Sequence, residues 1–137
     1  MTEFIEVKTA ELIGVALSWA VADATGADDA KVTSTGSVCC IYKMSCGSGC
    51  WTAYYEPSTD WSQGGPLIDE YKPWLSPPVG NDQDDEPYGW DAEIYSADGF
   101  EQLSHIIGAP TALIAACRAI VAAKLGETVR VPVELMK

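Results

Sequence analysis

The run PTALIAACRAIVAAKLG, residues 110–126, is the strongest single signal in this chain. Proline suits the first turn of a helix, and glycine suits the position just beyond its end. We therefore expect a helix over residues 110–125, begun by Pro110 and ended by Gly126. Most of its side chains are small alanines around a stripe of larger apolar residues, so more than one face can be buried. We expect it to pack on a sheet and also on another helix or a second subunit.

A second helix is expected over residues 9–25. The Thr9 hydroxyl can cap its first turn, and Gly26 can end it in a left-handed conformation. The preceding residues 4–8 alternate in polarity and suit a short strand. Apolar side chains recur through the helix at the spacing of one helical face, namely at Leu12, Val15, Ala16, Trp19 and Ala20.

Three further segments have the pattern of β-strands. Residues 38–55 suit a cysteine-containing hairpin, and residues 90–95 alternate cleanly. The valine-rich residues 129–133 suit an edge strand, where proline is tolerated. The sequence therefore predicts an α+β fold in a single domain, residues 1–137. Its small antiparallel sheet, packed by the N-terminal and C-terminal helices, is expected to contain residues near 38–56, 90–95 and 129–134.

The charge of the chain is strongly and unevenly negative. The net charge is −12, and residues 56–101 hold twelve acidic side chains against one lysine. A surface of this sign repels phosphate, so we expect no direct binding of DNA or RNA. Many of the acids fall in an expected loop over residues 76–89. They can form a solvated surface, or an acidic face that mimics nucleic acid and binds a basic partner.

Four of the five cysteines, Cys39, Cys40, Cys46 and Cys50, lie within twelve residues. Structural zinc sites usually present two closely spaced ligand pairs, and only Cys46 and Cys50 resemble one such pair. We therefore expect no bound metal and no other cofactor, with thiols packed along the hairpin. The sequence alone leaves both states of these four thiols, free or metal-bound, open.

No apolar run reaches the roughly 18 residues needed to cross a bilayer. The acidic N-terminus also lacks the basic region of a signal peptide. We therefore expect a cytoplasmic protein with no membrane partner.

Residues 57–68, PSTDWSQGGPLI, are the best candidate for a site. Asp60 can accept backbone N–H groups in a turn, and the double glycine allows positive φ or close approach of a backbone or ligand. The segment can be a structural corner pinned by a buried Trp61, or a binding site for a ligand or peptide. Catalysis lacks support, because Asp60 has no partner acid or histidine and no catalytic motif is present. The candidate binding residues are Ser58, Thr59, Asp60, Trp61, Gly64, Gly65 and Arg118.

Arg118 joins these candidates because it interrupts the apolar surround of the C-terminal helix. A buried guanidinium needs a partner, and we expect Asp60 or another acid of residues 56–101 to supply it. The single histidine, His105, lies between apolar residues. We expect it to be partly buried and hydrogen-bonded rather than catalytic.

Several of these segments resemble one protein family. STDW at residues 58–61 with GGPLI at residues 64–68 is similar to the core signature of the NinX-like proteins, which are small proteins of lambda-like phages and prophages. Residues 110–126 and 9–26 resemble that family's C-terminal and N-terminal helices, and the valine-rich tail also fits. The cysteine-containing residues 38–50 depart from the family. The resemblance implies a phage or prophage origin and brings no activity, substrate or catalytic residues.

We therefore predict a phage- or prophage-derived accessory protein, non-enzymatic, that acts through contacts with a host or phage protein. Such a protein would expose aromatic side chains around Trp61 or Trp74 and self-associate through the helix at 110–125. One alternative is an acidic nucleic-acid mimic that inhibits a basic host protein. A second is a small-molecule-binding protein or enzyme that uses the loop at 58–66, with a deep pocket lined by Asp60, Trp61 and the two glycines.

Overall fold

The computed structural model describes residues 3–43, 49–78 and 89–136 of the 137-residue chain. It has the predicted α+β class, and its strand pairs are antiparallel. The helices are α1 (Gly14–Ala24), α2 (Trp61–Tyr71) and α3 (Ala112–Leu125), with two 3₁₀ helices, η1 (Thr9–Glu11) and η2 (Val133–Met136). The strands are β1 (Phe4–Lys8), β2 (Asp28–Val32), β3 (Val38–Lys43), β4 (Gly49–Thr52), β5 (Trp74–Ser76), β6 (Trp90–Tyr95), β7 (Gln102–Ala109) and β8 (Thr128–Pro132).

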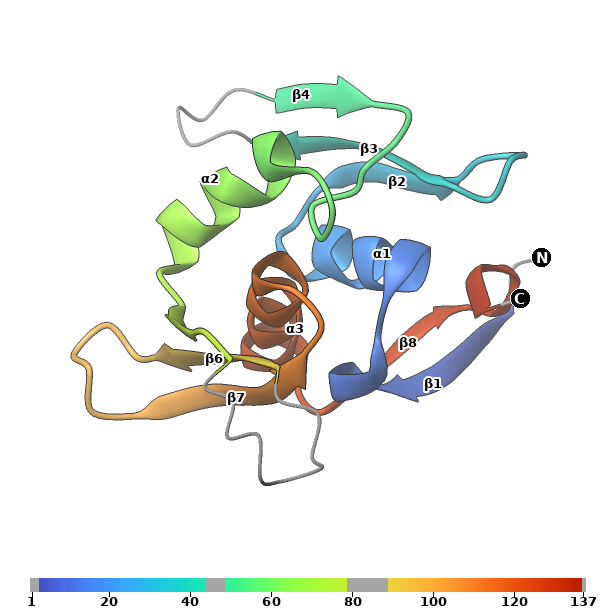
Figure 1. Ribbon diagram of the computed structural model, residues 1–137. Coiled ribbons are helices and arrows are strands. Elements are labelled where there is room, and N and C mark those ends of the chain that lie inside the picture. Colours follow the sequence, from blue (N-terminus) through green and yellow to red (C-terminus); the bar gives the residue numbers. More distant parts are fainter. Residues whose placement is uncertain (1–2, 44–48, 79–88, 137) are drawn as a thin grey trace.

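Helix α3 lies at the centre of the molecule (Figure 1). Strands β6 and β7 pack against one side of it, while α1 and α2 pack against other sides. Residues 113–121 are all buried, a run of more than two helical turns, so burial extends around the helix. The prediction of a helix buried on more than one face is confirmed. Self-association through α3 stays a prediction, and elements of the same chain already cover residues 113–121 of the helix.

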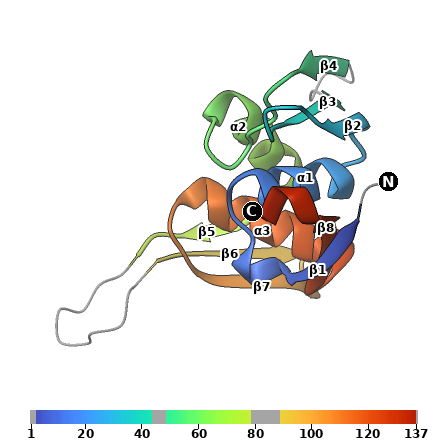
Figure 2. The same cartoon turned by 90° about the vertical axis from the view of Figure 1, so that its right-hand side faces the viewer.

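The strands form three small sheets rather than the single sheet expected. Strands β2, β3 and β4 form one, β5, β6 and β7 form another, and β1 pairs with β8 in a two-stranded ribbon. Figures 1 and 2 show the β2–β4 and β5–β7 sheets on opposite sides of the helices. The predicted strands at 38–42, 90–95 and 129–133 exist, but each belongs to a different sheet. Their separation follows from the central helices, which need apolar cover on several sides.

The N-terminal helix begins later than predicted. Thr9 lies in η1, and its hydroxyl donates a 2.7 Å hydrogen bond to the carbonyl of Gly126. It therefore ties η1 to the end of α3 instead of capping a helix. The predicted stop is confirmed, because Gly26 follows α1 with a φ of 74°.

Buried apolar side chains form one cluster that runs from Leu12 to Leu135. It takes in α1, α3 and the inner faces of the strands, and its largest fully buried side chain is Tyr55. Within the described ranges, no helix combines the length and the apolar character that crossing a membrane requires.

Candidate functional site

The predicted site segment, residues 57–68, builds the start of α2. Asp60 is the N-cap: its Oδ1 accepts hydrogen bonds from the Ser62 backbone N–H at 2.9 Å and from the Ser62 hydroxyl at 2.6 Å. The expected role of Asp60 as an acceptor in a local turn is confirmed. The residues that follow are helical rather than a loop, because this cap and the burial of Leu67 outweigh the internal Pro66.

The two glycines of this segment have different roles. A Cβ added to Gly64 would lie 2.2 Å from the Pro57 carbonyl oxygen and 2.6 Å from Leu113 Cδ2, so only glycine lets α2 approach both. An added Cβ on Gly65 meets nothing within 4 Å. Neither glycine has a positive φ, so that part of the prediction is wrong. Close approach is confirmed for Gly64.

Gln63, which the sequence analysis did not single out, fixes the segment before α2. Its side chain is 9% exposed. Its Oε1 accepts a hydrogen bond from the Glu56 backbone N–H, and its Nε2 donates to the Tyr54 carbonyl at 3.1 Å. A buried amide with both ends bonded to backbone is a structural clamp. Its position at N3 of a capped helix is a signal that could have revealed it.

Trp61 is 61% exposed, so the predicted buried pin is wrong. Its side chain instead borders a cavity of about 240 Å³ where the start of α2 meets the start of α3. The other lining residues are Ser58, Thr59 and the first turn of α3, residues 111–114. Gly65 lines a different, open hollow on α2. The four residues expected to share one enzyme pocket are therefore divided between different surfaces.

Arg118 does not join the other predicted site residues. It is 8% exposed, and its Nε donates a 2.7 Å hydrogen bond to the Leu12 carbonyl oxygen. Burial lowers the pKa of the guanidinium. In the part of the chain that the structure describes, no carboxylate pairs with it, so the predicted ion pair with Asp60 is wrong. Arg118 instead fastens the segment before α1 to α3.

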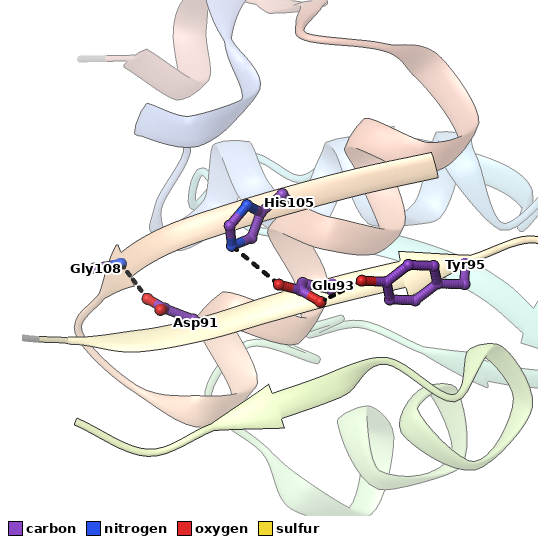
Figure 3. Close-up of polar contacts among 5 residues, drawn as sticks. All are labelled: Asp91, Glu93, Tyr95, His105 and Gly108. Carbon is purple, nitrogen blue, oxygen red and sulfur yellow. Dashed lines mark hydrogen bonds and ion pairs between the residues drawn. The ribbon is translucent and has the colours of Figure 1, made fainter. Parts of the chain in front are cut away.

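A second group of side chains lies on the outer face of the β5–β6–β7 sheet. Along β6 and β7 the buried residues face α3, and the alternating residues between them point away from it. Glu93 is at the centre of this face (Figure 3). Its Oε1 lies 3.3 Å from His105 Nε2, and its Oε2 accepts a 2.7 Å hydrogen bond from the Tyr95 hydroxyl.

Strand register explains why these residues meet. Trp74 of β5 and His105 of β7 are the direct cross-strand partners of Glu93. The Trp74 ring also meets the Tyr95 ring edge-on, with centroids 6.4 Å apart. The hydrogen bond expected for His105 stays a prediction: its Nε2 lies at ion-pair distance from Glu93, with which it forms an ion pair only if the imidazole is protonated, and its side chain is 38% exposed. Residue spacing in β6 could have placed Glu93 and Tyr95 on one face, but not their partners on other strands.

The same outer face carries apolar side chains. Trp74 is 69% exposed, Ile107 71% and Leu103 44%. Beside them, Asp91 Oδ1 accepts a 3.0 Å hydrogen bond from the Gly108 backbone N–H, which holds the end of β7 against β6 (Figure 3). We call the face made by Trp74, Asp91, Glu93, Tyr95, Leu103, His105 and Ile107 the outer sheet face.

Hydrogen bonding within the outer sheet face also changes the acidity of its phenol. The Glu93 carboxylate accepts a hydrogen bond from the Tyr95 hydroxyl and thereby raises the pKa of Tyr95. The reason is that the carboxylate stabilises the protonated phenol and repels the phenolate.

The cysteine hairpin is confirmed as the β3–β4 pair, in which Tyr42 faces Cys50. Cys46 and residues 44–48 of the expected hairpin lie outside the described residues, as do residues 79–88 of the expected acidic loop. Burial is the main cause that raises the pKa of Cys40 to about 11 and the pKa of Cys117 to about 12. Among the residues described, no three potential metal ligands gather in one place.

Comparison with known proteins gives the origin of the chain. A family model described as "Bacteriophage P22, NinX" matches residues 8–124. The chain therefore belongs to this phage protein family, as its motifs suggested. The match ends before β8, so the likeness of the valine-rich tail stays a prediction. No curated protein matches the sequence.

Proposed function

We propose that this NinX-family phage protein is an accessory, non-enzymatic protein that binds a partner protein through its outer sheet face. The observation that supports this is the group of exposed apolar side chains on one sheet. Trp74 and Ile107 are each more than two-thirds exposed on it. Large apolar side chains gathered on one face typically mark interaction sites.

The outer sheet face is also ordered before any partner arrives. Trp74 rests against Tyr95, Tyr95 donates to Glu93, and Glu93 pairs with His105. An aromatic anchor held in place by its neighbours loses little side-chain freedom on binding, and tryptophan is enriched among residues that dominate binding energy.

Charge indicates the kind of partner. Asp91 and Glu93 lie among the apolar residues, and the whole chain carries −12. A partner with a basic rim around an apolar centre would be steered toward this face and matched by it. We expect the partner to be a host or phage protein in the bacterial cytoplasm.

Affinity capture with matched tryptophan variants tests the proposal. The wild type, Trp74→Ala and Trp51→Ala would each be immobilised and exposed to lysate of bacteria that carry the phage genes. Trp51 is a suitable control because it is 66% exposed but lies on β4, in another sheet. We expect a partner that the wild type and Trp51→Ala retain and that Trp74→Ala loses. A partner retained equally by all three would contradict the proposal.

A further inference from the structure

A cleft between α1 and the β1–β8 ribbon has the features of a ligand site. It shares no residue with the outer sheet face and is therefore independent of the proposed function. Helix α1 packs against β8, and Figure 1 shows the ribbon beside the helix. One hollow of the cleft has a volume of about 330 Å³ and is lined by Phe4, Trp19, Asp23 and Arg130. This volume falls within the range of small-molecule sites, about 300–1,000 Å³.

A second hollow continues the cleft toward the end of α3. Its volume is about 270 Å³, and its lining includes Glu6 and Leu125. Asp23 and Arg130 line this hollow as well as the first one, so the two hollows meet at this pair of opposite charges.

Aromatic rings form one wall of the first hollow. The ring centroids of Phe4 and Trp19 are 6.5 Å apart, and the ring planes are tilted by 49°. Phe4 is 42% exposed and Trp19 is half-buried, so both rings are accessible to a ligand. Such a wall suits the apolar or aromatic part of a small molecule.

The charged groups that line the cleft are not paired with one another. Arg130 of β8 and Glu6 of β1 are direct cross-strand partners, an arrangement in which opposite charges usually attract each other. The Arg130 guanidinium instead lies over the Phe4 ring, with its Cζ 5.9 Å from the ring centroid. Among the described residues, Arg130 has no carboxylate within ion-pair distance, and neither Glu6 nor Asp23 has a basic partner.

These groups specify the chemistry of a ligand. A guanidinium presents N–H donors in a fork that matches a carboxylate, and the Asp23 and Glu6 carboxylates can accept hydrogen bonds from an ammonium group. A simple amine would leave the Arg130 donors without an acceptor, and a simple carboxylate would face two acids. A zwitterion satisfies both signs of charge. We infer that the cleft binds a free amino acid with an apolar or aromatic side chain, through its α-ammonium and α-carboxylate groups.

NMR titration of the full chain with L-phenylalanine tests this inference, at up to about 50 mM, a range suited to millimolar affinity. We expect saturable shifts of the Trp19 indole N–H and of the Asp23 and Arg130 amides. Phenethylamine lacks the carboxylate and 3-phenylpropanoate lacks the ammonium group. Each should bind at least about tenfold more weakly, because each loses charge-assisted hydrogen bonds. No shifts with L-phenylalanine, or equal affinity for either analogue, would overturn the inference.

Two other tryptophans serve as internal controls. Trp51 and Trp74 are 66% and 69% exposed, and they lie in the other two sheets. Their indole signals should not move with L-phenylalanine. Equal shifts of these indoles and of Trp19 would show non-specific aromatic association and would also overturn the inference.

Substitutions of the charged groups test their separate roles. Arg130→Gln should weaken L-phenylalanine binding about tenfold and leave phenethylamine binding within about threefold of wild type. Asp23→Asn should weaken L-phenylalanine binding about tenfold without weakening 3-phenylpropanoate binding. Both residues are exposed, so the variants should fold.

Lys31→Gln is the matched control for net charge, because Lys31 is exposed and lies on β2 in another sheet. It should bind L-phenylalanine as the wild type does. Wild-type affinity in Arg130→Gln would contradict the assignment. An equal loss of affinity in Lys31→Gln and Arg130→Gln would attribute the effect to net charge and contradict it too.

Discussion

The corner at residues 56–64 and the outer sheet face are built in opposite ways. The corner is held by buried contacts: Gln63 bonds to the backbone before α2, and Gly64 packs against Pro57 and Leu113. The outer sheet face consists of exposed and half-buried side chains, several of which contact one another. Changes at the corner should therefore lower the stability of the protein, and changes on the sheet face should lower partner binding.

The largest effect on stability is expected at Gly64. Gly64→Ala forces a Cβ into the Pro57 carbonyl and Leu113, and we expect a loss of about 2–3 kcal/mol in the free energy of unfolding. Gly65→Ala is the matched control, because its Cβ meets nothing and alanine favours the helix by about 0.5–1 kcal/mol. Urea denaturation measures both. Equal effects of the two substitutions on stability would contradict the close packing of α2 on α3 at Gly64.

Gln63 comes next. Gln63→Leu removes both side-chain hydrogen bonds and leaves the Glu56 N–H and the Tyr54 carbonyl without partners, at a cost of about 2 kcal/mol. Gln102→Leu makes the same chemical change at an exposed residue of β7 and should cost less than about 0.5 kcal/mol. If the two variants unfold at the same urea concentration, Gln63 is not the clamp described.

The Asp60 cap should contribute less. Asp60→Ala removes the acceptor of the Ser62 N–H and should cost about 1 kcal/mol, while Asp60→Asn keeps an acceptor and should change stability little. Thermal unfolding of the three proteins measures the difference. A drop for Asp60→Asn as large as that for Asp60→Ala would point to the charge rather than to the cap.

The smallest expected effect on stability comes from the Tyr95–Glu93 interaction on the outer sheet face, and it depends on the pKa of Tyr95. Glu93 raises this pKa in the folded protein, so the Tyr95–Glu93 interaction stabilises the fold fully below the usual tyrosine pKa near 10. That contribution is lost as the pH rises through the higher folded value. NMR titration of Tyr95 should show its pKa fall in Glu93→Gln. An unchanged pKa would mean that the hydrogen bond does not form in solution.

The sequence correctly predicted those features that are set by residues close together in the chain. The alanine-rich α3, the stop at Gly26 and the Asp60 turn all follow from short-range chemistry. Helix α2 was missed because Gly-Gly-Pro normally breaks helices. Here a side-chain cap and the burial of Leu67 offset that preference.

Features that depend on contacts between residues far apart in the chain were not predicted. Glu93 and His105 meet because β6 and β7 pair in one particular register, which alternation alone does not specify. The same limit explains why three strands assigned to one sheet belong to three. Arg118 was expected to pair with a carboxylate, but it donates a hydrogen bond to the carbonyl oxygen of Leu12, which is distant in sequence.

The contrast between the corner and the outer sheet face is tested most directly by the affinity of one captured, purified partner for two variants. Calorimetric titration would compare Trp74→Ala with Asp60→Ala, each shown to be folded. We expect Trp74→Ala to weaken binding by about thirtyfold or more, as for an interface anchor, and Asp60→Ala to leave it within about threefold of wild type. Binding that is lost in Asp60→Ala and kept in Trp74→Ala would place the interaction at the corner and contradict this account.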